Sequence, residues 1–463
     1  MRLSAGDLLG IEFLFAGNVD NLKKRILKGV STDSRYLKSG EIFFALRGEK
    51  YDGHEFVLKA FAAGAACAVV DEKADITAFK NHSYIIVNDT TKALGELARI
   101  YRKKFDIPVI AVAGSNGKTT TKEMIAQILS KKYTVHSTQG NLNNHIGVPQ
   151  TIFGLKKSHE IAVIELGTNH FGELEYLCGI AEPTHGLITN IGREHLEFFG
   201  DLDGVARAES ELWAALGKTG TGFINNDDPY VVATAKNIRR KVRYACSTRS
   251  VNLRGKILSI DENGCVTFRA TPKRKKPFEV TLSVPGNHVV SNAVAATAVG
   301  LYFKVSAKDI QRALGEFEAV SKRMEITKIG GITIINDTYN ANPDSVMSAL
   351  QTLQSMKASG RKIIILSDML EVGPDTKREH SRIGRTIGEM GFEFLLTYGN
   401  AARAIHENAD VKMKLHYDQK NILAEYAVEL VSAGDIVLVK GSRGMKMEDV
   451  VLFLQERLRG KMR

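Results

Sequence analysis

A short glycine-containing loop carries the strongest chemical signal in this sequence. It has the sequence Gly-Ser-Asn-Gly-Lys-Thr-Thr and directly follows the apolar run Pro108–Ala113. Backbone N–H groups of such a loop and of the following helix converge on phosphate oxygens. The lysine reaches the terminal phosphates, and the first threonine hydroxyl binds Mg²⁺. Val112 stands where the full motif has its first glycine, so a plain strand–helix turn is the alternative. The position between an apolar run and a helical stretch favours a nucleotide-binding loop made of Gly114, Ser115, Asn116, Gly117, Lys118, Thr119 and Thr120.

Two polar residues at the ends of later strand-like runs could complete a metal site beside this loop. Glu165 lies in the run Ile161–Leu166, just before Gly167, and His195 follows the run Gly186–Asn190. Ligands of open α/β sheets bind at the carboxyl ends of parallel strands, where oxygen or imidazole groups can hold a metal. Each residue also has an ordinary interpretation, the glutamate as a surface charge and the histidine as a hydrogen-bonded polar residue. The pattern leaves both interpretations open.

Strand-like and helix-like runs alternate around these residues, from about 107 to 318. Such alternation predicts βαβ units and a mainly parallel sheet covered on both faces. The predicted strands are Pro108–Ala113, Ile161–Leu166, Gly186–Asn190, Thr221–Asn225 and Val242–Ala245, and the predicted helices are Thr121–Lys131, Gly204–Leu216 and Asn287–Phe303.

The flanking segments complete an α/β protein, whose length fits about three domains. Residues 319–463 repeat the alternation, and Asn342 followed by Pro343 is typical of a helix start. Residues 1–106 form a smaller mixed unit, with a helix over Ala60–Ala68 and strands over Ala68–Asp71 and Tyr84–Val87. We predict a small mixed α/β N-terminal domain, a central P-loop parallel-sheet ATPase domain and a C-terminal Rossmann-like α/β domain. The predicted strands of the last domain are Thr333–Asp337, Lys362–Leu366, Phe394–Thr397, Lys414–Tyr417 and Asp435–Val439.

The composition excludes several protein classes. Of the 463 residues, 44% are hydrophobic and 25% are charged, as in globular proteins. No apolar run reaches the roughly 18 residues that a membrane span needs. The four cysteines lie far apart without a C-x-x-C pair, which is typical of a reduced compartment. We expect a cytoplasmic monomer.

The net charge of +11 comes from 63 Lys and Arg against 52 Asp and Glu. No stripe of basic and aromatic residues accompanies this excess, so we expect no nucleic-acid partner. The cluster Lys273–Lys276 follows an alternating stretch and a turn signal at Glu262–Gly264, and we predict that it is the exposed end of a hairpin. The excess positive charge suits a small anionic substrate.

Ordered motifs along nearly the whole chain resemble the Mur amide ligases. The segments Ser31–Arg35, Gly40–Leu46 and Asp52–His54 are similar to the uridine-nucleotide domain of that family. Gly114–Thr120 matches its short phosphate loop. The other matches of the central segment are Gly140–Pro149, similar to the loop facing the sugar-peptide substrate, Glu165–Asn169 and Asn190–Leu196, similar to the metal-ligand strands, and Gly286–His288 with Asn292, similar to the segment near the adenine.

Motifs of the last segment resemble one branch of the family. Asp337–Pro343 and Lys440–Gly444 resemble motifs beside the ATP and the incoming dipeptide, and Arg323 matches an arginine near the nucleotide. The run Tyr339–Pro343 is the most specific of these and favours the dipeptide-adding branch. The resemblance implies an ATP-dependent amide ligase that adds D-alanyl-D-alanine to UDP-N-acetylmuramoyl-tripeptide through an acyl phosphate, in peptidoglycan precursor synthesis. The alternatives are a superfamily ligase acting on UDP-N-acetylmuramoyl-dipeptide or resembling folylpolyglutamate synthase, and a P-loop nucleotide switch that does not ligate.

The resemblance also implies roles for domains and residues. Residues 1–106 would bind the UDP substrate, 107–318 would bind ATP, and 319–463 would bind the dipeptide and part of the ATP. Thr119 and Glu165 would hold the Mg²⁺ of the nucleotide, and His195 would help to hold a second ion. The implied catalytic residues are Lys118, Glu165, His195, Glu209 and Arg323, the further ATP contacts are Asn292, Arg323 and Asp337, and the substrate contacts are Ser34, Arg35, Asn141, Asn143, Asn144, Tyr339, Asn340, Asn342, Lys440, Ser442 and Arg443.

Glu209 is a departure from the family pattern. Most Mur ligases have at this position a lysine that reacts with CO₂ to form a carbamate beside the second metal. A glutamate would supply an anionic oxygen pair without modification, although on a shorter side chain. We therefore hypothesise that Glu209 replaces the carbamate; an ordinary surface glutamate on a helix is the alternative.

Overall fold

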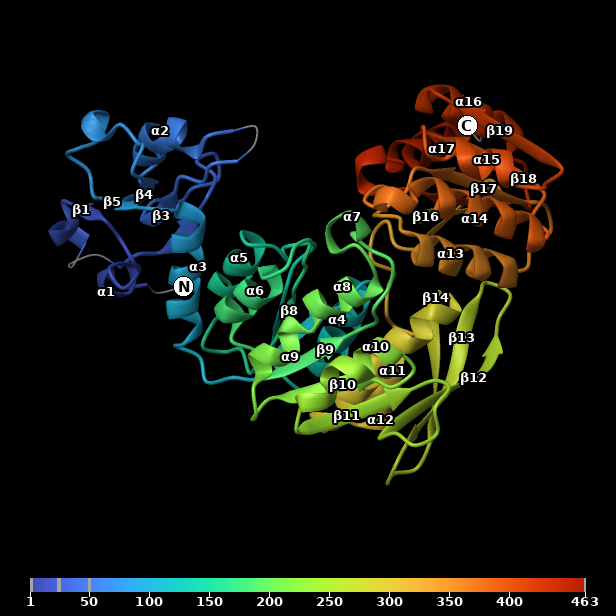
Figure 1. Cartoon of the computed structure of the whole chain (residues 1–463), viewed down its shortest axis with the longest axis horizontal. Coiled ribbons are helices and arrows are strands. Elements are labelled where there is room, and N and C mark those ends of the chain that lie inside the picture. The colour runs from blue at the N-terminus through green and yellow to red at the C-terminus, as the bar shows by residue number, and fades with distance from the viewer. Residues whose placement is uncertain (1–2, 23–25, 49–50, 462–463) are drawn as a thin grey trace.

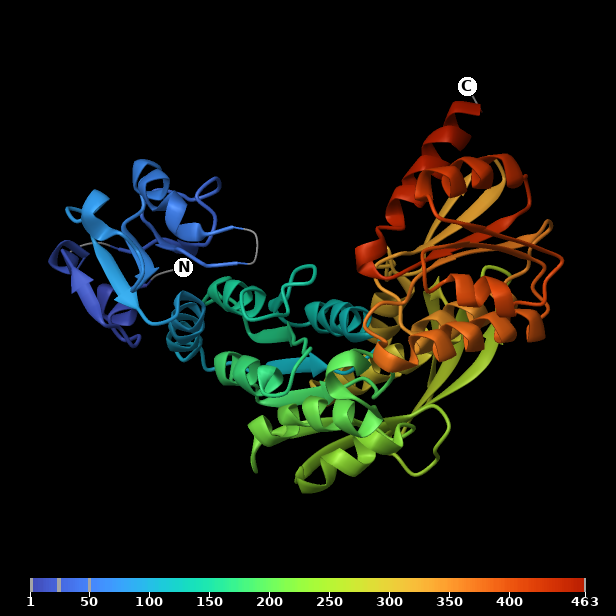
Figure 2. The ribbon, with the colours of Figure 1, turned by 45° about the horizontal axis from the view of Figure 1, so that its top comes forward.

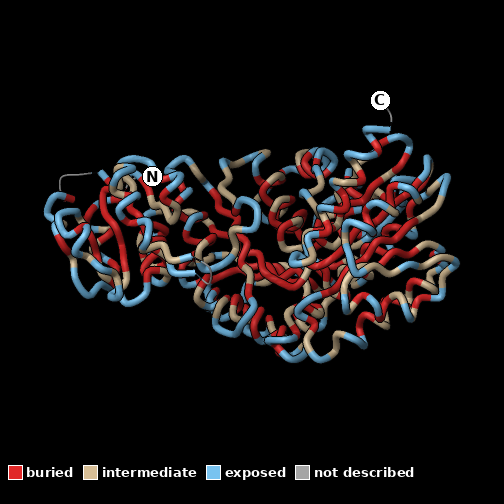
Figure 3. Tube along the Cα trace, turned by 90° about the horizontal axis from the view of Figure 1, so that it is seen from above, coloured by how far each residue is buried: buried red, intermediate tan, exposed pale blue. Residues whose placement is uncertain are grey.

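The computed structural model describes residues 3–22, 26–48 and 51–461, which form three α/β units around three sheets. The units follow one another along an elongated molecule, with the N-terminal unit at one end and the C-terminal unit at the other (Figure 1). Figure 2 shows the same order from a second direction, and buried segments run through all three units in Figure 3. No helix within the described ranges is long and apolar enough to cross a membrane.

The N-terminal unit has a five-stranded sheet in the order β1-β5-β4-β3-β2, in which only the β1–β5 pair is antiparallel. The predicted helix over Ala60–Ala68 is wrong, because α2 ends at Ala62 and Gly64 then adopts a left-handed conformation (φ +96°) before β4. Helix α3 joins this unit to the next, since its Tyr101 hydroxyl donates to the Leu155 carbonyl at 2.8 Å. The elements are α1 (Ala5–Leu8), β1 (Phe15–Gly17), η1 (Val19–Leu22), β2 (Gly29–Ser31), β3 (Glu41–Phe44), η2 (Gly53–Phe56), α2 (Val57–Ala62), β4 (Cys67–Asp71), η3 (Ile76–Ala78), β5 (Tyr84–Val87) and α3 (Thr90–Arg102).

The central unit has a nine-stranded sheet in the order β14-β13-β12-β11-β10-β9-β6-β8-β7. The strands from β7 to β12 are parallel, as predicted, and the β12–β13–β14 meander adds two antiparallel pairs at one edge. The predicted hairpin end at Lys273–Lys276 is confirmed, since it joins β13 to β14. The strands are β6 (Val109–Ala113), β7 (Val135–Ser137), β8 (Ile161–Glu165), β9 (His185–Ile188), β10 (Thr221–Asn225), β11 (Arg240–Ala245), β12 (Leu253–Ile260), β13 (Cys265–Pro272) and β14 (Phe278–Pro285).

Two central helices differ from the prediction. Helix α4 begins at Lys118 and not at Thr121, so the phosphate loop opens directly into it. The single helix predicted over Gly204–Leu216 is two helices, α8 and α9, because the Ser210 hydroxyl bonds back to the Arg207 carbonyl at 2.7 Å where the helix breaks. The helices are α4 (Lys118–Ser130), α5 (Gly147–Phe153), α6 (Glu173–Ala181), α7 (Leu196–Phe199), α8 (Leu202–Glu209), α9 (Glu211–Leu216), α10 (Pro229–Thr234), η4 (Ala235–Asn237), α11 (Asn287–Tyr302) and α12 (Ala307–Gly315).

The C-terminal unit has a six-stranded sheet in the order β15-β16-β20-β17-β18-β19, parallel except for β15. All five predicted strands are present, and Asn342 caps α13 with Pro343 at its first position, as predicted. The elements are β15 (Glu325–Ile329), β16 (Ile332–Asp337), α13 (Pro343–Ser355), β17 (Lys362–Ser367), η5 (Gly373–Asp375), α14 (Thr376–Glu389), β18 (Phe394–Tyr398), α15 (Arg403–Asn408), β19 (Met413–Tyr417), α16 (Lys420–Leu430), β20 (Ile436–Lys440), η6 (Arg443–Met445) and α17 (Glu448–Lys461).

Candidate active site

A cavity of about 580 Å³ lies between the central and C-terminal units. The carboxyl ends of β6, β8 and β9 line it from one side, and the end of β16 with the start of α13 lines it from the other. Open α/β sheets bind ligands at these strand ends, because the loops there carry polar side chains and free backbone N–H groups. The cavity therefore brings together segments that lie more than two hundred positions apart in the sequence.

The phosphate loop has the predicted form of strand, tight turn and helix. Gly114 (φ +111°) and Gly117 (φ +80°) both adopt left-handed conformations that side chains disfavour. A Cβ on Gly114 would also lie 2.4 Å from the Thr189 hydroxyl, so β9 packs closely against the loop. Asn292, predicted near the adenine, lies beside Gly117, where a Cβ would meet its amide at 2.6 Å. The loop is therefore closely packed, and the backbone N–H groups of Ser115 and Asn116 already donate to the carbonyl and the side chain of Asn190, at 2.9 and 3.1 Å.

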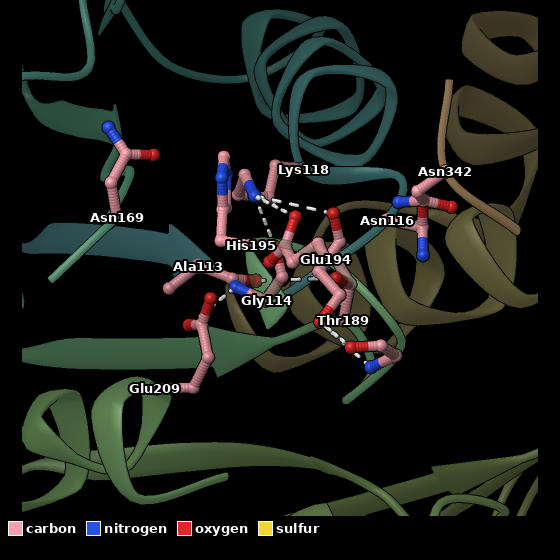
Figure 4. A network of polar contacts seen from close by, with 12 residues as sticks. Ala113, Gly114, Asn116, Lys118, Asn169, Thr189, Glu194, His195, Glu209 and Asn342 are labelled. Carbon is pink, nitrogen blue, oxygen red and sulfur yellow. Dashed lines mark hydrogen bonds and ion pairs between the residues drawn. The ribbon is translucent and has the colours of Figure 1, made fainter. Parts of the chain in front are cut away.

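Lys118 folds back onto its own loop (Figure 4). Its ammonium donates to the Gly114 carbonyl at 2.6 Å and the Ser115 carbonyl at 3.3 Å, and lies 3.4 Å from a carboxylate oxygen of Glu194. Burial lowers the pKa of Lys118, but the carboxylates around it outweigh this effect and raise the pKa above its ordinary value. The lysine is therefore a charged group that protein oxygens hold beside the loop.

Glu165 is the centre of a polar network at the end of β8. Its Oε1 accepts from the Thr119 hydroxyl at 3.1 Å and from the Asn143 amide at 2.8 Å. Arg323, from the other side of the cavity, donates to the same hydroxyl at 3.0 Å. The second oxygen of Glu165, Oε2, is buried and has no hydrogen-bond partner within the described residues. A buried carboxylate oxygen beside a threonine hydroxyl is a donor set that suits Mg²⁺.

His195 lines the same cavity, but the C-terminal unit holds it. Its Nδ1 lies 2.7 Å from Glu371 Oε2, within ion-pair distance. Both residues have left-handed backbones, with φ of +48° and +64°. The Glu197 N–H donates to the Glu371 carbonyl at 3.3 Å, so the loop before α7 and the loop after β17 lie together.

Glu209 lies under the phosphate loop. Its side chain is 1% exposed, and its Oε2 accepts from the Gly114 N–H at 2.8 Å (Figure 4). Burial raises the pKa of this carboxyl to about 8, although the Lys118 ammonium lowers it in part. An exposed helix position for this residue is therefore wrong; the glutamate supports the loop that would bind phosphate.

The C-terminal unit contributes a second set of predicted residues. The Arg323 guanidinium lies over the Tyr339 ring, 3.8 Å from its centre. Asn342 donates to the Asn116 side chain of the phosphate loop at 2.9 Å. Lys440 is 2% exposed and bonds inside its own unit, to Asp337 at 2.7 Å and to the Asn340 carbonyl at 2.9 Å. The lysine therefore fixes the Asp337–Asn342 loop beside the cavity.

Other predicted substrate contacts lie outside the cavity lining. Ser34 and Arg35 are in the N-terminal unit, and the Arg35 guanidinium pairs with Asp33 at 2.7 Å. The Ser442 hydroxyl donates to the Ala341 carbonyl at 3.0 Å, and Arg443 pairs with Glu448 at 2.9 Å. The cavity lining includes the predicted contacts Asn143, Asn144, Tyr339 and Asn340. It does not include Ser34, Arg35, Asn141, Ser442 or Arg443.

The sequence interpretation missed two carboxylates of the site. Glu194 faces Lys118, and Asp344 accepts from the Arg193 backbone at 2.7 Å and its guanidinium at 2.9 Å. Glu194 precedes the predicted metal ligand His195, and Asp344 follows Pro343 at the start of α13. Their positions beside predicted site residues could have suggested a role for both carboxylates. The residues that they contact, however, lie far away in the sequence, so the contacts themselves were not predictable.

Comparison with known proteins identifies the family. The Mur ligase middle domain matches residues 112–300, the glutamate ligase domain of Mur ligases matches 322–443, and the catalytic domain of the Mur ligase family matches 26–133. The UDP-N-acetylmuramoyl-tripeptide–D-alanyl-D-alanine ligase of Bacillus subtilis is 37% identical over 441 residues, which cover 94% of each chain. A crystal structure of MurF from Acinetobacter baumannii has a TM-score of 0.90 at 31% identity, covering 98% of this chain and 99% of its own. The MurF ligase from Thermotoga maritima in complex with ADP has a TM-score of 0.83 at 25% identity, covering 94% and 99%. With its phosphate loop, its three α/β units and these full-length similarities, the chain belongs to the Mur ligase family.

Proposed function

We propose that this enzyme joins D-alanyl-D-alanine to UDP-N-acetylmuramoyl-tripeptide, with hydrolysis of ATP, in peptidoglycan precursor synthesis. The observation that carries this function is the shared cavity, which places Lys118, Glu165 and Arg323 around one phosphate-binding loop. Relatives of the D-alanyl-D-alanine-adding branch match over nearly the whole chain. The enzyme is therefore an ATP-dependent ligase that forms a C–N bond.

The chemistry requires two anions to meet. The terminal carboxylate of the tripeptide attacks the γ-phosphorus of ATP, ADP leaves, and an acyl phosphate forms. The free amine of the dipeptide then attacks the acyl carbon, loses a proton, and phosphate leaves with the bonding electrons. Such phosphoryl transfer depends on alignment and charge neutralisation more than on covalent help from the protein. We assign the neutralisation to Lys118, which belongs to the phosphate loop, and to Arg323, which reaches the Thr119 hydroxyl from the C-terminal side of the cavity.

Two residues, one at the start of α4 and one at the end of β8, fit the Mg²⁺ that this reaction uses. Thr119 and Glu165 would hold it, because Glu165 Oε2 is a buried anionic oxygen without a partner among the described residues. Bound there, the cation would neutralise the charge that builds up on the phosphates. We assign the binding of a second metal ion to His195. Its ring would then either move away from Glu371 or keep this contact while the other ring nitrogen binds the ion.

We propose three roles for the three units. Residues 1–106, with Ser34 and Arg35, bind the UDP part of the acceptor; 107–318 bind ATP, with Asn292 and Asp337 at its edge. Residues 319–463 bind the dipeptide through the loop of Tyr339, Asn340 and Asn342 and through Lys440, Ser442 and Arg443. Lys440, Ser442 and Arg443 all donate hydrogen bonds to Asn340 or Ala341, which supports their role in shaping this loop.

An amine screen tests the function and its alternatives. Phosphate release is measured with UDP-linked tripeptide or dipeptide acceptors, in the presence of D-alanyl-D-alanine, single amino acids, glutamate with a folate acceptor, or no amine. We expect release only with the tripeptide and the dipeptide amine together. Faster release with a single amino acid would instead assign another ligase of the superfamily, and amine-independent hydrolysis would favour a nucleotide switch.

We propose that Glu209 removes the need for CO₂. Its carboxyl group is already buried beside Gly114, which supports a pair of unmodified oxygen atoms at the position where the family has a modified lysine. Burial raises its pKa to about 8, so the group would give up its proton on binding a metal cation. Turnover in CO₂-depleted buffer should equal turnover after bicarbonate is added. Glu209→Ala should lower turnover strongly, and Glu209→Lys should regain some of it with bicarbonate. A wild-type enzyme that loses activity on depletion and regains it with bicarbonate would show that some other lysine carries a carbamate.

We also propose that the enzyme works as a monomer in the cytoplasm. All four cysteines are free thiols, which supports a reducing compartment. Light scattering on a gel-filtration column should give a mass near 51 kDa, the mass of one chain at 50.9 kDa. A concentration-independent mass of twice this value would contradict the monomer.

A further inference from the structure

Glu194 faces the lysine of the phosphate loop, and the mechanism above gives it no role. Its Oε2 lies 3.4 Å from the Lys118 ammonium, and the side chains are 9% and 16% exposed. Figure 4 shows the carboxylate directed at the ammonium, which also contacts the Gly114 and Ser115 carbonyls. Oxygen atoms of the protein therefore surround the ammonium that a nucleotide phosphate would need.

The residues on either side of Glu194 are held by the C-terminal unit. Arg193 binds Asp344 through its backbone N–H and its guanidinium, at 2.7 and 2.9 Å. His195 lies 2.7 Å from Glu371 on the other side. Asp344 of α13 and Glu371 of the loop after β17 thus hold Arg193 and His195 in place, and Glu194 between them points to the phosphate loop. Helix α13 also contacts the phosphate loop itself through Asn342 and Asn116.

A carboxylate in this position opposes nucleotide binding in two ways. It offers the ammonium an opposite charge that a phosphate must replace, and it repels the phosphate itself. Both effects are stronger where water is scarce, as they are between two largely buried side chains. We propose that Glu194 is a built-in competitor of the nucleotide for Lys118, held in place by the docked C-terminal unit. The proposal rests on the function proposed above only in that the loop binds a nucleotide.

The first test measures nucleotide affinity and not turnover. ADP binding to the full-length protein is followed by calorimetry in EDTA and again with Mg²⁺, for the wild type, Glu194→Gln and Glu197→Gln. Glu197 lies three positions later, in α7, with an exposed side chain, so its variant controls for the loss of one negative charge. We expect Glu194→Gln to bind ADP about tenfold more tightly in EDTA, as for removal of one charged interaction, and Glu197→Gln to match the wild type.

Three results would overturn the proposal. Equal or weaker ADP binding by Glu194→Gln in EDTA would show that the carboxylate does not compete. Unchanged binding in EDTA together with weaker binding in Mg²⁺ would assign the residue to metal binding and not to competition. An equal gain in Glu197→Gln would reduce the effect to net charge. A wild type that binds no ADP would refute the nucleotide function itself, which distinguishes that failure from failure of the competitor alone.

The second test asks whether the C-terminal unit holds Glu194 in place. Asp344→Ala removes both contacts to Arg193, and its effect on ADP affinity in EDTA is measured in the wild type and in the Glu194→Gln background. Asp344→Ala should tighten ADP binding severalfold when Glu194 is present and by a smaller factor when it is replaced by Gln. The difference between the two factors reports the coupling to Glu194, because other consequences of losing Asp344 are the same in both backgrounds. The same factor in both backgrounds would show that docking does not act through Glu194.

Discussion

Glu165→Gln separates the charge of the proposed Mg²⁺ ligand from its hydrogen bonds. The amide oxygen can keep the bonds from Thr119 and Asn143, because Oε1 already accepts both. What changes is Oε2, a buried oxygen without a partner in the described part of the chain, on a residue that is 1% exposed. A buried polar group left unpaired costs about 1–3 kcal/mol, and a charged one costs more. Without metal, the neutral variant should therefore be more stable by about 1 kcal/mol, or about 2–4 °C in melting temperature for a domain of the central unit's size.

Mg²⁺ should reverse this order. A ligand present at about one hundred times its Kd stabilises the folded state by about 2.7 kcal/mol. The wild type should therefore have a clearly higher melting temperature with ADP and Mg²⁺ than with ADP and EDTA. Glu165→Gln should show little of this metal-dependent rise. Thermal melting with and without ADP, in EDTA or Mg²⁺, measures both effects, and Glu173→Gln, another carboxylate of the cavity lining, is the matched control. An undiminished metal-dependent rise in Glu165→Gln would refute the assigned ligand, and a lower melting temperature in EDTA would refute the cost of the unpaired oxygen.

Three further substitutions test the site. Lys118→Ala should lower turnover by about 10³-fold, as expected when a preorganised charge at a developing anion is lost, while a melting curve shows that the protein remains folded; most activity retained would refute the phosphate role. Arg323→Lys loses the planar stack on Tyr339, so kcat/KM should fall by about tenfold or more, and unchanged kinetics would show that any cation suffices. Because burial raises the folded-state pKa of Glu209 to about 8 from its ordinary 4.5, its contribution to stability is fully present below pH 4.5 and is lost as pH rises through 8. In EDTA, the melting temperature of Glu209→Gln should therefore be higher than that of the wild type at pH 8 and similar to it at about pH 5. Equal melting temperatures at pH 8 would contradict the raised pKa.

The sequence determined the parts of the site that depend on neighbouring residues. The apolar run before Gly114 forms β6, and the glycines take backbone angles that other residues disfavour, so strand, loop and helix follow from one short segment. The start of α13 was predictable in the same way, because Asn342 and Pro343 satisfy the first turn of a helix locally. The alternation of strands and helices likewise predicted two mainly parallel sheets.

Tertiary structure decided the rest, because the partners are remote along the chain. Glu194 lies opposite Lys118 across 76 positions, and Arg323 meets Thr119 across 204. The side chains of Lys440 and Ser442 belong to motifs that suggested substrate contacts, yet both now bond within their own unit. The break of the predicted helix at Ser210 was also not readable from periodicity, since apolar spacing continues across it. Hydrophobic periodicity records which face of an element is buried, but the docking of one unit on another sets which charged groups meet, and that depends on the packing of whole surfaces.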